Sequence, residues 1–442
     1  MKRVALLGDA RFRRAGLTTI VAGLASLASL VVTFLTVPAL LAYLGPVQFG
    51  IYMTLATTVA ALGWLDLGVG LGLMNLLTTC FGREDIEGAR RYISNALLAI
   101  LLLAASFGLL FALLFHFIPW HEMFKVSQDF GPQLEPSVIA LAVCIGLAMP
   151  TSLAGRIQSA RQRGYVTSLW DIGARVLTLG GVFIAIQLQA SLPQILLIAL
   201  GAPILTAACN GIVLLGFQSP WLRPSLAFVH LGSALDVVKK GGLFVLLQLV
   251  SAAAFGSDNI VILQILGPSA VSDYTVIRTF FLMAASATTI MLMPLWPAYG
   301  EALALGEAGW VRRMLRLSLM LTTLVSTAAG LTLVLTSQLL LPIWVDQIVP
   351  ATLPLLLGLA AYLVVTTCGN ALAMLLNAAS VIRFQIATAL VMGASTLVAK
   401  TVFGQQFGLT GVVWGTVVAY TVCSLLPTLF YMRRWLNNLE AG

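Results

Sequence analysis

Ionisable side chains lie inside long apolar stretches of this sequence, where burying a charge is costly unless it has a partner. Asp258 precedes the end of one stretch, at Leu266, by eight residues, and Arg278 lies a similar distance beyond the following turn. If both stretches are helices, each residue rises about 1.5 Å, so both side chains lie roughly 12 Å below the turn. They can therefore form a structural ion pair. Alternatively, Arg278 faces a cavity and binds an anionic ligand, with Asp258 as its partner at rest.

Other polar residues at similar depth are candidates for lining the same cavity. Asp171 and Arg175 are four residues apart, one helical turn, so they can pair with each other or face a ligand. Asp66 and Asn75 lie in a glycine-rich apolar stretch and are also candidates for lining the cavity. Arg14 lies at the end of an apolar stretch, where a long basic side chain extends toward water by default, and a cavity role is its alternative.

The remaining candidates favour structural roles. Lys400 stands alone near the end of an apolar stretch and is interpreted as an interfacial anchor rather than a ligand. His116, His121 and Glu122 match no metal-site spacing, so no metal is expected. The sequence also has no phosphate-binding loop, nucleophile elbow or H-E-x-x-H pair, which argues against ATP-driven chemistry by this chain.

The overall composition identifies the elements that must position these residues. The chain has 442 residues, of which 60% are hydrophobic and only 9% charged, whereas a soluble domain has about 25% charged residues. This excludes a soluble or disordered protein and fits a multi-pass membrane protein. The five cysteines are scattered without motif spacing, so they are expected to pack as small apolar residues.

Twelve apolar stretches are long enough to cross a membrane, which needs about 20 residues. The first is too long for a signal-peptide core and is interpreted as an uncleaved helix. The sequence therefore predicts an all-α membrane protein with spans at about 15–43, 50–80, 92–118, 136–159, 166–189, 193–217, 241–266, 270–298, 314–338, 351–378, 384–402 and 409–432.

The basic residues orient these spans. With the N-terminus inside, the inner segments hold twenty of the 24 Lys and Arg residues, whereas the outer loops hold only Lys125 and Lys400. This distribution follows the positive-inside rule and predicts cytoplasmic termini. It also explains the net charge of +8 without a nucleic-acid partner.

The sequence contains an internal repeat with an offset of 222 residues. Leu44-Gly45-Pro46 followed by Tyr52 recurs as Leu266-Gly267-Pro268 followed by Tyr274, and Arg90-Arg91 falls on Arg312-Arg313. The repeat predicts two parallel six-helix lobes related by a pseudo-two-fold axis along the membrane normal. Their expected bounds are 1–220 and 241–442, joined by a cytoplasmic linker at 221–240.

Two spans at matching positions of the repeat contain helix-breaking residues. The second span holds the glycine-rich segment 63–72, and the eighth holds Pro294 and Pro297. These residues predict interrupted helices of the kind that form substrate sites in transporters, or close helix packing through Gly68 and Gly72. The segment 301–316 is expected to be an amphipathic helix along the inner interface.

Five parts of the sequence form a pattern in their order and spacing: Leu44 to Tyr52, Asp66-Leu67-Gly68, Asp258, Leu266-Gly267-Pro268 with Tyr274 and Arg278, and Phe407 to Gly411. Together they resemble the polysaccharide-export branch of the multidrug/oligosaccharidyl-lipid/polysaccharide (MOP) flippase superfamily, over nearly the whole chain. The chain departs from that branch at Ser272-Asp273, where glycine before a small or apolar residue is usual, which affects only the local turn.

The resemblance implies a flippase of the O-antigen type, built like multidrug (MATE) transporters, in the bacterial inner membrane. Its substrate would be an oligosaccharide on undecaprenyl pyrophosphate, moved to the outer leaflet by alternating access. No cofactor is implied, and proton or sodium coupling stays open. A polysaccharide polymerase and a chain-length regulator are the implied protein partners. The expected cavity residues are Arg278, Arg175, Asp258, Asp66, Asn75, Asp171, Arg14, Tyr52 and Tyr274.

Two other functions stay open. A cation-coupled multidrug antiporter of the same superfamily would bury acids for cationic drugs, whereas this chain buries acids and arginines together. A membrane-embedded glycan polymerase or ligase would carry a large outer loop, and the longest outer loop here has about 16 residues, 120–135.

Overall fold

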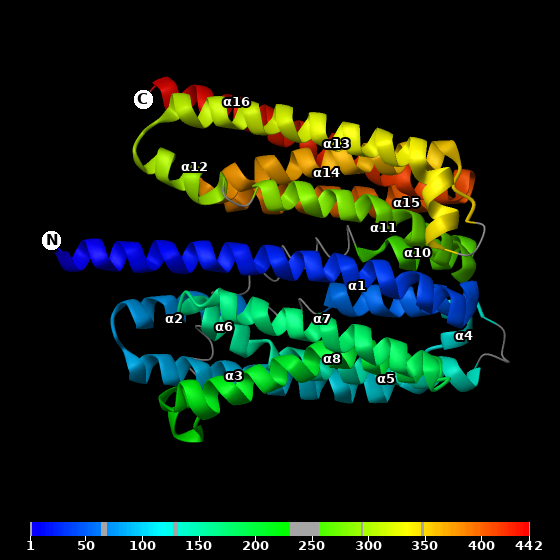
Figure 1. Cartoon of the computed structure of the whole chain (residues 1–442), viewed down its shortest axis with the longest axis horizontal. Coiled ribbons are helices and arrows are strands. Elements are labelled where there is room, and N and C mark those ends of the chain that lie inside the picture. Colours follow the sequence, from blue (N-terminus) through cyan, green and yellow to red (C-terminus); the bar gives the residue numbers. More distant parts are fainter. Residues whose placement is uncertain are drawn as a thin grey trace. The chain divides into compact units, whose positions relative to one another are not determined.

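The computed structural model describes residues 2–62, 69–126, 131–229, 256–292, 295–345, 349–379 and 381–441. In these ranges the chain forms helices and turns and contains no β-strand (Figure 1). Long helices are the expected solution for such an apolar chain, because a helix satisfies its backbone hydrogen bonds within one segment. The predicted all-α membrane fold is confirmed for this part of the chain.

The chain divides into two compact units. The first comprises residues 1–43 and 55–249. Within it, α7 packs on α8 and α8 packs on α5. Its long helices are α1 (Lys2–Leu62, shared with the second unit), α2 (Val69–Gly82), α3 (Ile86–Leu114), α5 (Gly131–Thr151), α6 (Leu153–Ala160), α7 (Gly164–Gln187) and α8 (Leu192–Val213). Its short elements are η1 (Phe115–Phe117), α4 (Trp120–Phe124), the π-helix η3 (Leu214–Gln218), η4 (Pro220–Leu222) and η5 (Leu226–Phe228).

The second unit comprises residues 44–54 and 250–442. Within it, α14 packs against both α13 and α15. Its elements besides the α1 segment are α10 (Asp258–Leu266), α11 (Pro268–Leu292), α12 (Leu295–Ala304), α13 (Ala308–Trp344), α14 (Leu353–Ala378), α15 (Ile382–Tyr420), the π-helix η6 (Thr421–Leu425) and α16 (Leu426–Ala441).

Segment 44–54 therefore groups with the second unit, although its sequence position lies within the expected first lobe. Gly50 explains the close association, because a Cβ atom at this residue would lie 1.9 Å from the carbonyl oxygen of Pro268. Most of the expected linker 221–240 lies outside the described residues, so the lobe boundaries stay a prediction.

Eight described helical segments are long and apolar enough to cross a membrane. The last of them contains two of the expected spans, separated where the backbone leaves helical geometry at Gly408 (φ 62°, ψ −142°). The expected second, seventh and eighth spans run through residues outside the described ranges, so the count of twelve stays a prediction. The eight segments are Gly16–Thr58, Ile86–Phe117, Pro132–Ala160, Gly164–Gln187, Leu192–Gln218, Ala308–Trp344, Leu353–Ala378 and Arg383–Asn438.

The 222-residue repeat reappears in the backbone geometry. Gly45 (φ 73°, ψ 168°) and Gly267 (φ 89°, ψ 175°) share a conformation that is essentially restricted to glycine. The turn that ends α2 has a positive φ at Glu84, and the turn that ends α12 has one at Gly306. Helices α3 and α13 then begin 222 residues apart. The two halves therefore share their local turns as well as their motifs.

The prediction of a separate interfacial helix at 301–316 is wrong. The turn at Gly306 divides this segment, so its first residues end α12 and the rest begin the long helix α13. The predicted interruptions fall largely outside the described residues, because residues 63–68 precede α2 and residues 293–294 lie between α11 and α12.

Candidate functional site

The buried carboxylate of Asp258 organises a polar cluster inside the second unit. Asp258 is 4% exposed and opens helix α10. Its Oδ2 atom accepts a 2.7 Å hydrogen bond from the Tyr274 hydroxyl and lies 3.8 Å from Nε of Arg278. Its Oδ1 atom forms an ion pair with Nζ of Lys400. The predicted proximity of Asp258 and Arg278 is confirmed, whereas their role toward a ligand stays a prediction.

The local sequence explains how three helices meet at this carboxylate. Gly267 allows a tight reversal between α10 and α11, because only glycine readily adopts its backbone geometry. On α11, Tyr274 and Arg278 are one helical turn apart and therefore share a face. Helix α15 packs against α10 and supplies Lys400.

Lys400 was predicted to be an interfacial anchor, and this prediction is wrong. The residue is 0% exposed, pairs with Asp258 and donates a 3.3 Å hydrogen bond to Oγ of Ser257. A signal was present in the sequence, because Lys400 lies eight residues before Gly408, just as Asp258 lies eight before Leu266. Equal depth on the two helices could have indicated a shared layer, but the contact also needs α15 beside α10.

The cluster carries one more positive charge than negative, because two cations share a single carboxylate. Lys400 is the closer partner of Asp258, and Nε of Arg278 makes no hydrogen bond within the described part of the chain. The Arg278 guanidinium carbon lies 5.8 Å from the centroid of the Tyr274 ring. Lys400 is therefore the nearer of the two cations that share this carboxylate, and Arg278 is the farther one.

Arg278 also lines a cavity of about 250 Å³ within the second unit. The cavity wall includes polar groups of Tyr362, Asn370 and Tyr420 among apolar side chains. The Tyr362 hydroxyl forms a hydrogen bond with Arg278 and helps to orient the guanidinium group. Sequence reasoning missed these residues, because tyrosine and asparagine in a helix give no signal that they face an arginine on another helix.

The structure does not bring all predicted site residues into this cluster. Tyr52 is buried and stacks on Phe49, with ring centroids 6.2 Å apart. Asp171 and Arg175 on α7 are both exposed, and no ion pair joins them within the described ranges. Asn75 is exposed on α2.

Two further predicted residues have no described side-chain environment. Asp66 lies outside the described residues, and Arg14 lies on α1 without a described side chain. Where the structure describes the chain, no three His, Cys, Asp or Glu side chains are grouped closely enough to hold a metal ion.

A comparison with known protein families identifies the family to which this chain belongs. Residues 17–302 match the family described as polysaccharide biosynthesis protein. The chain belongs to this family. The match covers the first unit from residue 17 onward, together with Asp258, Tyr274 and Arg278, whereas Lys400 lies beyond it. No curated protein sequence matches the chain.

Solved structures of the MOP superfamily share the fold over nearly their whole length. A multidrug resistance MATE transporter in an inward-facing conformation has a TM-score of 0.77 at 14% identity, covering 95% of this chain and 96% of its own. A MATE protein in complex with MaD3S has a TM-score of 0.68 at 15% identity, covering 98% and 97%.

A third similar structure is a MOP superfamily transporter from Pyrococcus furiosus, described as having a binding pocket of reverse polarity that suggests a different function. Its TM-score is 0.71 at 14% identity, covering 97% of each chain. At these identities the likeness shows the fold alone. Family and fold together show a polysaccharide biosynthesis protein with several helices long and apolar enough to cross a membrane, built on the fold of the MOP superfamily transporters.

Proposed function

We propose that this protein flips an oligosaccharide linked to undecaprenyl pyrophosphate from the cytoplasmic to the outer leaflet of the bacterial inner membrane. The observation that carries the proposal is the net positive charge of the Asp258, Arg278 and Lys400 cluster, together with the position of Arg278 in a cavity wall. Membership of the polysaccharide biosynthesis family supports a glycan as the cargo.

The proposed role of Arg278 follows from charge. A pyrophosphate group cannot cross hydrocarbon without compensating cations, and a guanidinium group binds phosphate oxygens through two parallel hydrogen bonds. Because Lys400 pairs closely with Asp258, Arg278 can bind the head group while the carboxylate stays neutralised. The exposed Arg175 and Asp171 on α7 are proposed as additional polar contacts for the head group or the sugars.

The proposed path of the substrate follows from its lipid nature. The polyprenyl tail stays in the bilayer while the head group crosses by alternating access of the two lobes.

The proposed orientation in the membrane follows from the basic residues. The excess of Lys and Arg in the predicted inner segments supports cytoplasmic termini. A polysaccharide polymerase and a chain-length regulator are the proposed partners on the outer side, and proton or sodium coupling is the proposed source of any driving force.

A cation-coupled multidrug antiporter is the second candidate, because several of the similar structures are MATE transporters. A site for cationic drugs needs an acid that is free to bind them. In the described part of the second unit, the buried carboxylate of Asp258 already has Lys400 and Arg278 beside it. The charge balance of this cluster therefore favours an anionic substrate.

Complementation of a flippase-deficient bacterial strain tests the proposal. We expect Arg278→Ala to abolish surface glycan while the protein still inserts, because no other described side chain of the cavity wall carries a positive charge. Wild-type protein must restore the glycan. Full export by the variant refutes the cavity role, whereas drug resistance conferred by wild-type protein without any glycan export favours the antiporter.

Exchanging the two charges separates binding from packing. The double variant Asp258→Arg with Arg278→Asp keeps the net charge of the cluster, but it places the new guanidinium group beside Lys400 and should be less stable than wild type. Export is therefore measured per folded protein in the membrane. The double variant should not export the glycan, because residue 278, which lines the cavity, then carries a carboxylate that repels an anionic substrate. Normal export by this variant shows that the pair is structural only.

A further inference from the structure

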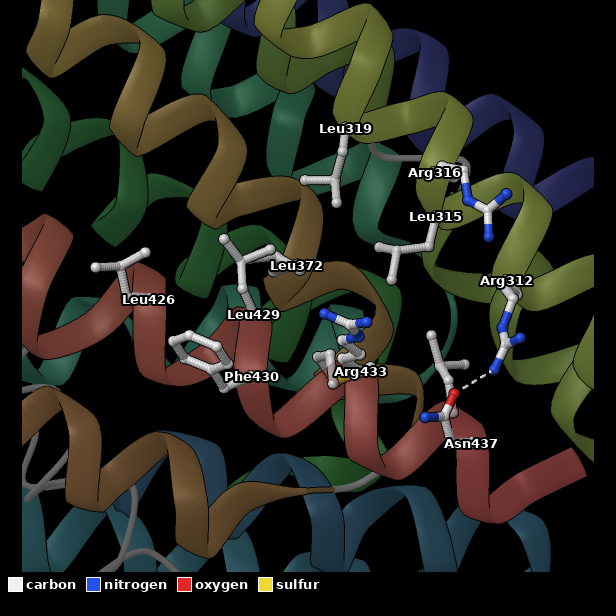
Figure 2. Close-up of a pocket in the computed structure, with 12 residues that line it drawn as sticks. Arg312, Leu315, Arg316, Leu319, Leu372, Leu426, Leu429, Phe430, Arg433 and Asn437 are labelled. Carbon is white, nitrogen blue, oxygen red and sulfur yellow. Dashed lines mark hydrogen bonds between the residues drawn. The ribbon is translucent and has the colours of Figure 1, made fainter. Parts of the chain in front are cut away.

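A larger cavity lies elsewhere in the second unit and takes no part in the proposed transport site. It has a volume of about 670 Å³ and lies between α13, α14 and α16 (Figure 2). Helix α14 contributes to both cavities, with Tyr362 in the wall of the buried site and Leu372 in the wall of this one. Ten residues of helix separate these two side chains by about 15 Å along the axis.

The lining of this cavity is charged at one end and apolar at the other. Arg312 near the start of α13 donates a 2.7 Å hydrogen bond to Oδ1 of Asn437 near the end of α16, so these two helix ends meet. Moving away from this contact, the lining passes to Leu319 on α13 and to Phe430 and Leu426 on α16 (Figure 2). Such a gradient matches a molecule with an anionic head and a hydrocarbon tail.

The charged end holds three arginines, Arg312, Arg316 and Arg433. Both Arg316 and Arg433 are exposed, and neither has an acidic partner among the residues that the structure describes. The positive charges of Arg316 and Arg433 repel each other, so an anion between these two side chains would lower the free energy of this region. The two side chains come from facing helices, and a phosphate group between them could accept hydrogen bonds from both.

We propose that this cavity binds an anionic phospholipid of the surrounding membrane. Its phosphate lies between Arg316 and Arg433, and one acyl chain lies along Leu319, Leu426 and Phe430. A volume of about 670 Å³ is within the range of small-molecule sites, and basic pockets between membrane helices on the cytoplasmic side are known to hold anionic lipid head groups. The positive-inside prediction places these arginines on that side.

The apolar half of the cavity distinguishes a lipid from a water-soluble anion. Leu426 and Phe430 are 42% and 64% exposed, so the structure leaves their apolar surface uncovered. An inorganic phosphate ion would use only the arginines and leave this surface open. A phospholipid covers both parts at once, which is why we assign the site to a membrane lipid.

Lipid titration of the purified full-length protein in detergent tests this assignment, with bound lipid counted by native mass spectrometry. The probes are phosphatidylglycerol and phosphatidylcholine with identical acyl chains, undecaprenyl diphosphate, and inorganic phosphate as a competitor. We expect one phosphatidylglycerol to bind at least tenfold more tightly than phosphatidylcholine. Inorganic phosphate should displace it only at far higher concentration.

Two charge-matched double variants show whether the cavity arginines are responsible. Arg316→Gln with Arg433→Gln should abolish the preference for phosphatidylglycerol. Arg313→Gln with Arg434→Gln should retain it, because these two arginines are exposed on the same helices but do not line the cavity. Both variants lower the net charge equally, so a general electrostatic effect would weaken binding in both.

Four outcomes would overturn the proposal. These are equal loss of binding in the two double variants, equal affinity of the wild type for the two phospholipids, equally effective displacement by inorganic phosphate, and tighter binding of undecaprenyl diphosphate at the same stoichiometry. The last result would make the cavity a substrate site. The comparison of lipids on wild-type protein needs no variant, so it decides the question even if a variant fails to fold.

Discussion

Removing Lys400 tests whether this buried lysine keeps Arg278 available to substrate. In Lys400→Met, Asp258 loses its closer partner but retains Arg278, whose Nε lies 3.8 Å from the carboxylate. At an effective dielectric constant of about 20, two unit charges at this distance attract by about 4 kcal/mol before desolvation. We therefore expect Arg278 to move toward Asp258, and the net charge of the cluster to fall from one to zero.

The matched perturbation is Asp258→Asn, which has nearly the same shape as wild type but leaves two buried cations without a carboxylate. Breaking a buried ion pair in this way costs about 3–5 kcal/mol. Lys400→Met should cost clearly less, because Arg278 can still compensate Asp258. The double variant Asp258→Asn with Lys400→Met should recover part of the stability lost in Asp258→Asn, because one of the two unpaired cations is gone.

Thermal unfolding in detergent and surface-glycan complementation measure the two effects. Lys400→Met should remain folded yet lose export, whereas Lys125→Met, which alters an exposed cation, should change neither. The reasoning is refuted if Lys400→Met lowers the unfolding temperature as much as Asp258→Asn does. It is also refuted if Lys400→Met folds and exports as well as wild type.

Two further substitutions test the packing around the cluster. Tyr274→Phe removes the 2.7 Å hydrogen bond to Asp258 and should lower the free energy of unfolding by about 1.5–3 kcal/mol, measured by thermal unfolding. An unchanged melting temperature would contradict a role for this bond. Gly50→Ala places a Cβ atom 1.9 Å from the Pro268 carbonyl oxygen and should cost about 1–3 kcal/mol. In the control Gly108→Ala, the added Cβ atom meets no other atom within 4 Å. This substitution should leave the free energy of unfolding unchanged or raise it.

Much of the candidate site could be predicted from local properties of the sequence. Depth along a helix follows from counting residues, so Asp258 and Arg278 could be placed at one level on either side of the Gly267 turn. The same counting placed Arg175 and Asp171 inside the membrane on α7, where the structure leaves both side chains exposed without an ion pair in the described ranges, and their role toward a ligand stays a prediction. Counting residues gives the depth of a side chain but not the direction in which it points.

Local features of the sequence are enough to predict the class of protein, the internal repeat and the positions of the main turns. Apolar run length, the positions of basic residues and the conformational demands of Gly45, Gly267 and Gly408 are local properties that need no knowledge of neighbouring helices. The folded chain, by contrast, was needed to show that Lys400 pairs with Asp258, 142 residues earlier in the sequence. It also showed that Arg316 and Arg433, which the sequence explained by topology alone, line one cavity. Both contacts depend on which helices pack together, and helix packing is set by the combined shapes of many side chains.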